Sequence, residues 1–187
     1  MAEKIYVLDS NIILHNNQYI EQLSDGGSNI VVIPETVLIE LEEFKKSSGE
    51  LGYQAREFAR KLARCKVVES LHRMEYSIVK MQSDTGAKIH LFSKKSYSSD
   101  IDTSHLQESN DKRIIEVATA AQNFYKGHKV KFVSLDIYAR MFGLMANVRV
   151  ETLNEDRNEL PKFRFIKRLE LDSSYFNTIN SKSAKEF

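Results

Sequence analysis

Three absences from the sequence restrict where the protein works and what it can bind. Cys65 is the single cysteine, so no intramolecular disulfide can form, which suits a reducing compartment. No apolar run is long enough to span a bilayer, and the N-terminus has no basic-then-apolar signal pattern. Neither sign of charge is in excess, since 27 Lys and Arg residues stand against 26 Asp and Glu residues. We therefore expect a cytoplasmic protein without a membrane partner, in which any nucleic-acid site is local.

Apolar residues gather in short continuous runs that predict a buried sheet. The chain has 187 residues, 42% of them hydrophobic, which is enough for one domain with a real core and too few for two full-sized domains. Continuous runs rich in β-branched residues, without polar alternation, indicate strands covered on both faces, as in a parallel sheet. The predicted strands are 4–9, 29–34, 129–136 and 147–152.

Helical periodicity lies between these runs. Residues 35–46, 49–64 and 110–127 each place apolar residues on one face, with Pro34 at a favoured first-turn position and Gly127 placed to end the last helix. Alternation of strands and helices predicts an α/β fold, a three-layer α/β/α sandwich with a central parallel sheet.

Two regions interrupt this alternation. Residues 81–110 contain one predicted strand, 87–92, followed by a loop rich in Ser and Asp. We therefore place the domain at residues 1–153. Residues 154–187 form a C-terminal tail that is either a linker or the source of an additional edge strand.

Four acidic residues fall where a parallel sheet would bind a ligand. Asp9 and Asp136 each follow a predicted strand, Asp111 opens a predicted helix, and Glu40 lies two turns into another. Ligands bind beyond the carboxyl ends of parallel strands, so these side chains could converge at one edge. Each also has an ordinary interpretation: Asp9 and Asp111 as helix caps, Asp136 as a turn residue, Glu40 as part of a solvated face. The combination favours a site.

Five segments resemble, in order and spacing, the blocks of a PIN domain, most closely those that precede a PhoH-type ATPase in bacterial and phage proteins. They are VLDSNIIL, VVIPETVLIELEEFKK, GELGYQAREFARKL, SNDKRIIEVA and VKFVSLDIYARMFG, and the resemblance covers roughly residues 4–153. PIN domains are Rossmann-like, metal-dependent ribonucleases. The resemblance places the family's acids on Asp9, Glu40, Asp111 and Asp136, with Ser10 standing where the family pattern has Thr.

The resemblance implies a metal-dependent endoribonuclease that hydrolyses phosphodiester bonds in single-stranded RNA. The four acids would be both the catalytic residues and the ligands of Mg²⁺ or Mn²⁺, hard cations that prefer oxygen donors. The five histidines show no metal-ligand spacing, which argues against zinc. Residues expected to hold the carboxylates in place are Ser10, Asn11, Asn110 and Ser134. The alternative is a PIN fold without catalysis, used to bind RNA or a protein.

Basic and aromatic residues near the expected site are candidates for RNA contacts. Arg56, Arg60 and Arg64 recur every four residues on one helix face, which is also typical of a solvated face. Beside an acidic site, a basic flank would attract phosphates past the carboxylates. Tyr53 and Tyr97 could stack on bases, or pack half-buried. The residues that we predict to bind RNA are Lys45, Lys46, Tyr53, Arg56, Arg60 and Arg140.

The sequence has no G-x-x-x-x-G-K-[ST] pattern, so a PhoH-type ATPase is not in this chain. The chain is either a fragment of an ATPase-fused protein or a free-standing PIN protein. A linked ATPase domain and a homo-oligomer both stay open.

Overall fold

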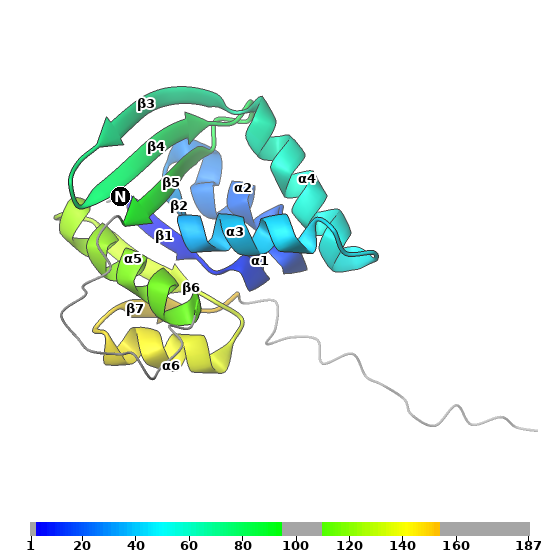
Figure 1. The fold of residues 1–187 in the computed structure, drawn as a ribbon. Helices are drawn as coiled ribbons and strands as arrows, with labels where there is room; N and C mark the ends of the chain where they lie inside the picture. The colour runs from blue at the N-terminus through cyan, green and yellow to red at the C-terminus, as the bar shows by residue number, and fades with distance from the viewer. Residues whose placement is uncertain (1–2, 95–109, 154–187) are drawn as a thin grey trace, which may run out of the picture. The chain divides into compact units, whose positions relative to one another are not determined.

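A seven-stranded mixed sheet forms the centre of the domain (Figure 1). The structure is a computed structural model, and it describes residues 3–94 and 110–153. The strand order is β3-β4-β5-β2-β1-β6-β7. The strands are β1 Lys4–Leu8, β2 Ile30–Pro34, β3 Lys66–His72, β4 Tyr76–Gln82, β5 Lys88–Lys94, β6 Lys129–Val133 and β7 Arg149–Glu151.

The predicted strands form the parallel part of this sheet. β1 lies between β2 and β6 and is parallel to both, and β5 and β7 extend the parallel set on either side. Every residue of β2 is buried, which explains its continuous apolar sequence. The strand predicted at 129–136 ends earlier, at Val133, because residues 134–136 leave the sheet to build the polar edge described below.

The hairpin of β3 and β4 was not predicted. β4 pairs antiparallel with both β3 and β5, so this end of the sheet is antiparallel. β3 is an edge strand, and six of its seven residues are exposed. An exposed edge strand has no buried face to impose apolar alternation, and its sequence therefore gives little strand signal.

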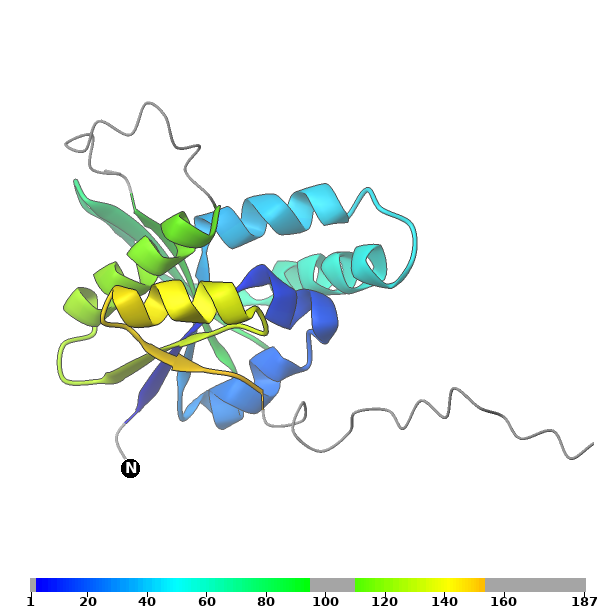
Figure 2. The same ribbon diagram turned by 90° about the horizontal axis from the view of Figure 1, so that it is seen from below.

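Helices cover both faces of the sheet (Figures 1 and 2). The predicted helices are present as α3, α4 and α5, and Pro34 is the N-cap of α3, one position before the first-turn site expected for it. The short helices α1, α2 and α6 and the 3₁₀ turn η1 were not predicted. The bounds are α1 Ser10–His15, α2 Tyr19–Ser24, η1 Asp25–Gly27, α3 Glu35–Phe44, α4 Glu50–Arg64, α5 Asn110–Phe124 and α6 Ile137–Met145.

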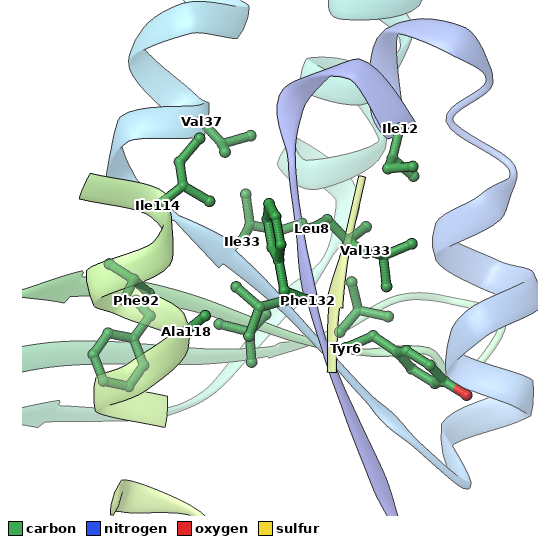
Figure 3. Packing of buried hydrophobic residues seen from close by; sticks show 14 of the residues in the cluster. Tyr6, Leu8, Ile12, Ile33, Val37, Phe92, Ile114, Ala118, Phe132 and Val133 are labelled. Atoms are coloured by element: carbon green, nitrogen blue, oxygen red, sulfur yellow. The ribbon is translucent and has the colours of Figure 1, made fainter. Parts of the chain in front are cut away.

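Buried side chains fill the space on both sides of the sheet (Figure 3). Phe132 and Val133 are neighbours in β6, so their side chains point to opposite faces. On one side Val37 of α3 and Ile114 of α5 pack near Phe132, and on the other Ile12 of α1 lies near Val133. All five are at least 99% buried, so the sheet is held rigidly between its two helical layers.

The carboxyl ends of β1, β2 and β6 meet at one edge, because these strands are parallel and in register. Asp9, the start of α3 and the segment 134–136 follow them directly. The compact unit containing this edge comprises residues 1–153. The predicted tail at 154–187, and Tyr97, lie outside the described residues. No helix in the described part is long and apolar enough to cross a membrane.

Candidate functional site

Asp9 is a buried carboxylate that accepts hydrogen bonds on both oxygens. Its Oδ1 accepts from the Ser10 backbone N–H at 2.7 Å, and it is the N-cap of α1. Its Oδ2 accepts from Ser134 Oγ at 2.6 Å and from Asn11 Nδ2 at 2.7 Å. A long bond from Ser10 Oγ to Oδ1, at 3.5 Å, is the fourth. A carboxylate offers about four acceptor directions, so these bonds fix Asp9, and a further partner would take the place of the Ser10 hydroxyl.

Ser134 connects the ends of β1 and β6. Its hydroxyl is fully buried and donates to Asp9, while it accepts from Asn11 Nδ2 at 3.1 Å and from the Asp136 backbone N–H at 3.0 Å. One donor and two acceptor positions are all a hydroxyl has, so this group is fully used. Asn11 Oδ1 adds a bond from the Leu135 N–H at 3.1 Å. Ser10, Asn11 and Ser134 therefore lie where the sequence places them, around Asp9.

Asp136 is the N-cap of α6. Its Oδ1 accepts from the Tyr138 N–H at 2.7 Å, and no described residue donates to its Oδ2. Asp111 lies inside the first turn of α5, after the exposed Asn110, and is not a cap of that helix within the described residues. The ordinary interpretation as a helix cap is therefore right for Asp9 and wrong for Asp111, while Asp136, expected as a turn residue, is itself a cap. The cap bond uses only Oδ1 of Asp136, so within the described part of the chain Oδ2 is available to another partner.

The pKa shifts of Asp9 and Asp111 indicate that the four acids are near one another. Burial raises the pKa of Asp9, its hydrogen bonds oppose that rise, and the charges of Glu40 and Asp111 add to it. Burial also raises the pKa of Asp111, and the charge of Asp136 raises it further. These repulsions link Glu40 to Asp9, Asp9 to Asp111, and Asp111 to Asp136. The structure thus brings together acids from four elements that are far apart in sequence.

The acids are neighbours without forming a closed cage. Among the described residues, no group of three or more His, Cys, Asp or Glu side chains is arranged so that it could hold one metal ion. Mg²⁺ commonly binds through one or two carboxylates and keeps several waters, so a looser set of oxygens suits it. The donor set is also all oxygen, as hard divalent cations require.

The predicted RNA contacts of α3 and α4 are dispersed. Lys45 pairs with Glu42 at 2.7 Å, while Lys46 and Tyr53 are exposed. Arg56 Nη1 donates to the carbonyls of Lys45 and Ser47 at 2.9 and 3.1 Å, which ties the loop between the helices to α4.

Arg60 lies away from the four acids. It pairs with Glu57 and lines a hollow with residues of the turn 83–85, which precedes β5. That turn is at the amino ends of the parallel strands, the opposite edge of the sheet from Asp9. Arg60 therefore lies near the amino ends of the parallel strands and not beside Asp9, and its contact with RNA stays a prediction.

Arg140 binds the backbone of the segment that carries Asp136. Its Nη1 donates to the carbonyls of Ser134 and Leu135 at 2.8 and 3.0 Å. The sequence led us to predict RNA as the partner of Arg140, and these carbonyl contacts were not predicted. Backbone acceptors leave no sequence signal, so only the spacing of Arg140 one turn after Asp136 could have suggested the contact.

Comparison with known proteins is consistent with this geometry. Residues 6–154 match the family model described as PIN domain. Protein PhoH2 of Bacillus subtilis (strain 168) is 27% identical over 158 residues, covering 82% of this chain. The chain spans about a third, 34%, of that relative's length. A domain of a functionally unknown protein from Methanocaldococcus jannaschii DSM 2661 has the same fold. Its TM-score is 0.52 at 17% identity, over 91% of this chain and 100% of that one.

Proposed function

The chain belongs to the PIN-domain family, whose members are generally nucleases, and from this we propose that it is a metal-dependent endoribonuclease that cuts single-stranded RNA. The observation that supports the proposal is electrostatic: the charges of Glu40 and Asp111 raise the pKa of Asp9, and the charge of Asp136 raises that of Asp111. Like charges repel, so their gathering lowers stability unless a cation is present to offset it.

Mg²⁺ or Mn²⁺ is the cofactor that fits this all-oxygen donor set, and Asp9, Glu40, Asp111 and Asp136 would hold it, one or two of them directly and the others through its waters. When bound, such an ion lowers the pKa of a coordinated water and neutralises charge that develops on the scissile phosphate. Asp9 is held in one orientation by Ser134 and Asn11 on Oδ2, which fixes the direction of Oδ1, where a cation would replace the long bond from Ser10 Oγ. Glu40 and Asp111 complete the ligand set or orient the attacking water.

Hydrolysis of the backbone requires a water oxygen to attack phosphorus while the bond to the leaving oxygen breaks. Arg140 holds the backbone of residues 134 and 135, and thereby the position of Asp136. Single-stranded RNA is the proposed substrate because its backbone can enter an acidic edge that only a few side chains line. The similarity to PhoH2 also supports a linked PhoH-type ATPase domain outside this chain.

The proposal is tested by cleavage of single-stranded and of structured RNA by the purified chain. We expect cleavage of the single-stranded RNA with Mn²⁺ or Mg²⁺ and none in excess EDTA. Asp9→Asn should abolish it, while Asp84→Asn, an exposed acid far from the edge, should leave it intact. Cleavage that persists in EDTA or in Asp9→Asn contradicts the proposal. RNA binding without any cleavage supports the binding-module alternative instead.

A further inference from the structure

The outward face of α6 is built almost entirely of large apolar side chains. Their exposed fractions run from 45% for Met141 to 82% for Met145, and they make up half of the large apolar side chains that are exposed in the described part of the chain. Figure 2 shows α6 in front of the other elements, with no described element drawn across it. The six residues are Ile137, Tyr138, Met141, Phe142, Leu144 and Met145. We call them the α6 face.

The helix packs against the domain by its small residues. Ala139 and Gly143 are buried, and a Cβ on Gly143 would lie 2.8 Å from Val150 and 3.3 Å from Phe132. At 100° per residue, the six large side chains fall within an arc of roughly 160° on the opposite side. This reverses the usual amphipathic arrangement, in which the large apolar residues point inward.

The α6 face carries no charged side chain. Arg140 is the helix's one ionisable side chain apart from Tyr138, and its guanidinium is turned to the carbonyls of Ser134 and Leu135. Binding to RNA depends largely on cations that contact phosphates, and this face offers none. Exposed apolar patches of this kind mark surfaces that bind protein.

We propose that the α6 faces of two copies of this chain pack together in a two-fold symmetric dimer. If a full side chain presents about 200 Å², the exposed fractions amount to roughly 700 Å² of apolar surface per copy. Stable complexes bury about 800 Å² per partner, so the face matches what a dimer needs. A symmetric contact joins the same patch on both copies, and an uncharged patch does so without repulsion.

The dimer is tested by analytical ultracentrifugation of the full chain over a range of concentrations. We expect a reversible dimer in the wild type. Met145→Glu should raise its dissociation constant at least about tenfold, because the symmetry brings two new charges into one interface. Met74→Glu is the matched control, since Met74 is 95% exposed on the turn between β3 and β4 and should dimerise as the wild type does.

A tryptophan reporter identifies which surface is buried. The chain has no Trp, so Tyr138→Trp reports only the α6 face. We expect its emission to shift to shorter wavelength as concentration rises, in step with the dimer fraction. A wild type that stays monomeric contradicts the proposal. So does a dimer that Met145→Glu leaves intact, or one whose formation leaves the tryptophan emission of the Tyr138→Trp variant unchanged.

Discussion

The hydroxyl of Ser134 holds two carboxylate-bearing segments in register through three hydrogen bonds. It is fully buried, and its partners come from Asp9, Asn11 and the backbone of Asp136. Removing it leaves buried polar groups without partners, which costs more than the bonds themselves contribute. A small side chain thus has a large effect at this edge.

Ser134→Ala should therefore lower the free energy of unfolding by about 1–3 kcal/mol. It should also weaken binding of Mn²⁺ by about tenfold, because Asp9 loses a group that fixes its orientation. Chemical denaturation and metal titration measure the two effects. Ser28→Ala, at an exposed position, is the control and should change neither. A Ser134→Ala protein with unaltered metal affinity would show that Asp9 is not oriented through Ser134.

At the scale of elements, β5 contains a buried histidine next to α5. His90 is 6% exposed, and its Nδ1 lies 2.6 Å from Tyr125 Oη, a residue just beyond the end of α5. Burial lowers the pKa of His90 to about 4, assisted by the charges of Lys80 and Lys88 and opposed by those of Glu3 and Glu69. The neutral ring is therefore the form that the folded state accepts.

This burial predicts a loss of stability in mild acid. The folded pKa lies below the unfolded value of 6.5, so the unfolded chain takes up the proton first as pH falls. The contribution of His90 is fully present above about pH 6.5 and is lost toward pH 4, by up to roughly 3 kcal/mol. Unfolding of wild type and His90→Asn across this range measures it. The variant should have the flatter pH dependence, and identical slopes would exclude His90 as the cause.

The elements that could be predicted are those with a buried face. β1, β2 and α5 have apolar patterns imposed by the core, and they lie within a few residues of their predicted bounds. β3 is exposed along nearly its whole length, and α1 is only six residues long, so neither leaves a clear period. α6 reverses the usual pattern by packing through Ala139 and Gly143, and periodicity therefore could not reveal it.

The site was more predictable than the surface around it. Asp9, Ser10 and Asn11 directly follow β1, and Ser134 and Asp136 directly follow β6, so strand direction alone brings these residues to one edge. Asn110 is exposed at the first residue of α5, and its expected role stays a prediction. Arg56 and Arg140 were expected to face RNA, but each has a guanidinium nitrogen bound to backbone carbonyls. The carbonyls that these arginines bind are positioned by the path of a loop, and a loop path leaves no periodic pattern in the sequence from which such contacts could be predicted.

At the scale of the whole molecule, the predicted RNA contacts differ in where they lie relative to the acids. Lys46 is exposed and lies two residues beyond the end of α3, the helix that carries Glu40. Lys46→Ala should reduce the salt dependence of RNA binding by about 0.7 of a unit, the value of one lost phosphate contact to a single strand. Arg60→Ala, at the opposite edge, should leave the slope unchanged. RNA binding measured at several salt concentrations gives the slope for each variant. A larger reduction of the slope in Arg60→Ala than in Lys46→Ala would indicate that RNA lies along α4.

The central claim is that the four neighbouring acids share one cation, bound by one or two of them directly and by the others through its waters. This claim can be tested on the stability of the protein, without an activity assay. At about 5 Å and an effective dielectric near 20, each pair of like charges repels by roughly 3 kcal/mol, less in salt water. Asp136→Asn removes one such charge, and Asn caps a helix nearly as well as Asp. The metal-free variant should therefore be as stable as the wild type or more stable.

Thermal unfolding of wild type and Asp136→Asn, each with and without Mn²⁺, tests this claim most directly. Mn²⁺ at 100 times its Kd should stabilise the wild type by about 2.7 kcal/mol, a rise in Tm of roughly 5–10 °C. The rise should be clearly smaller in Asp136→Asn and undiminished in the control Asp84→Asn. An equal response in wild type and Asp136→Asn would remove Asp136 from the site, and no response in any of the three proteins would contradict the site itself.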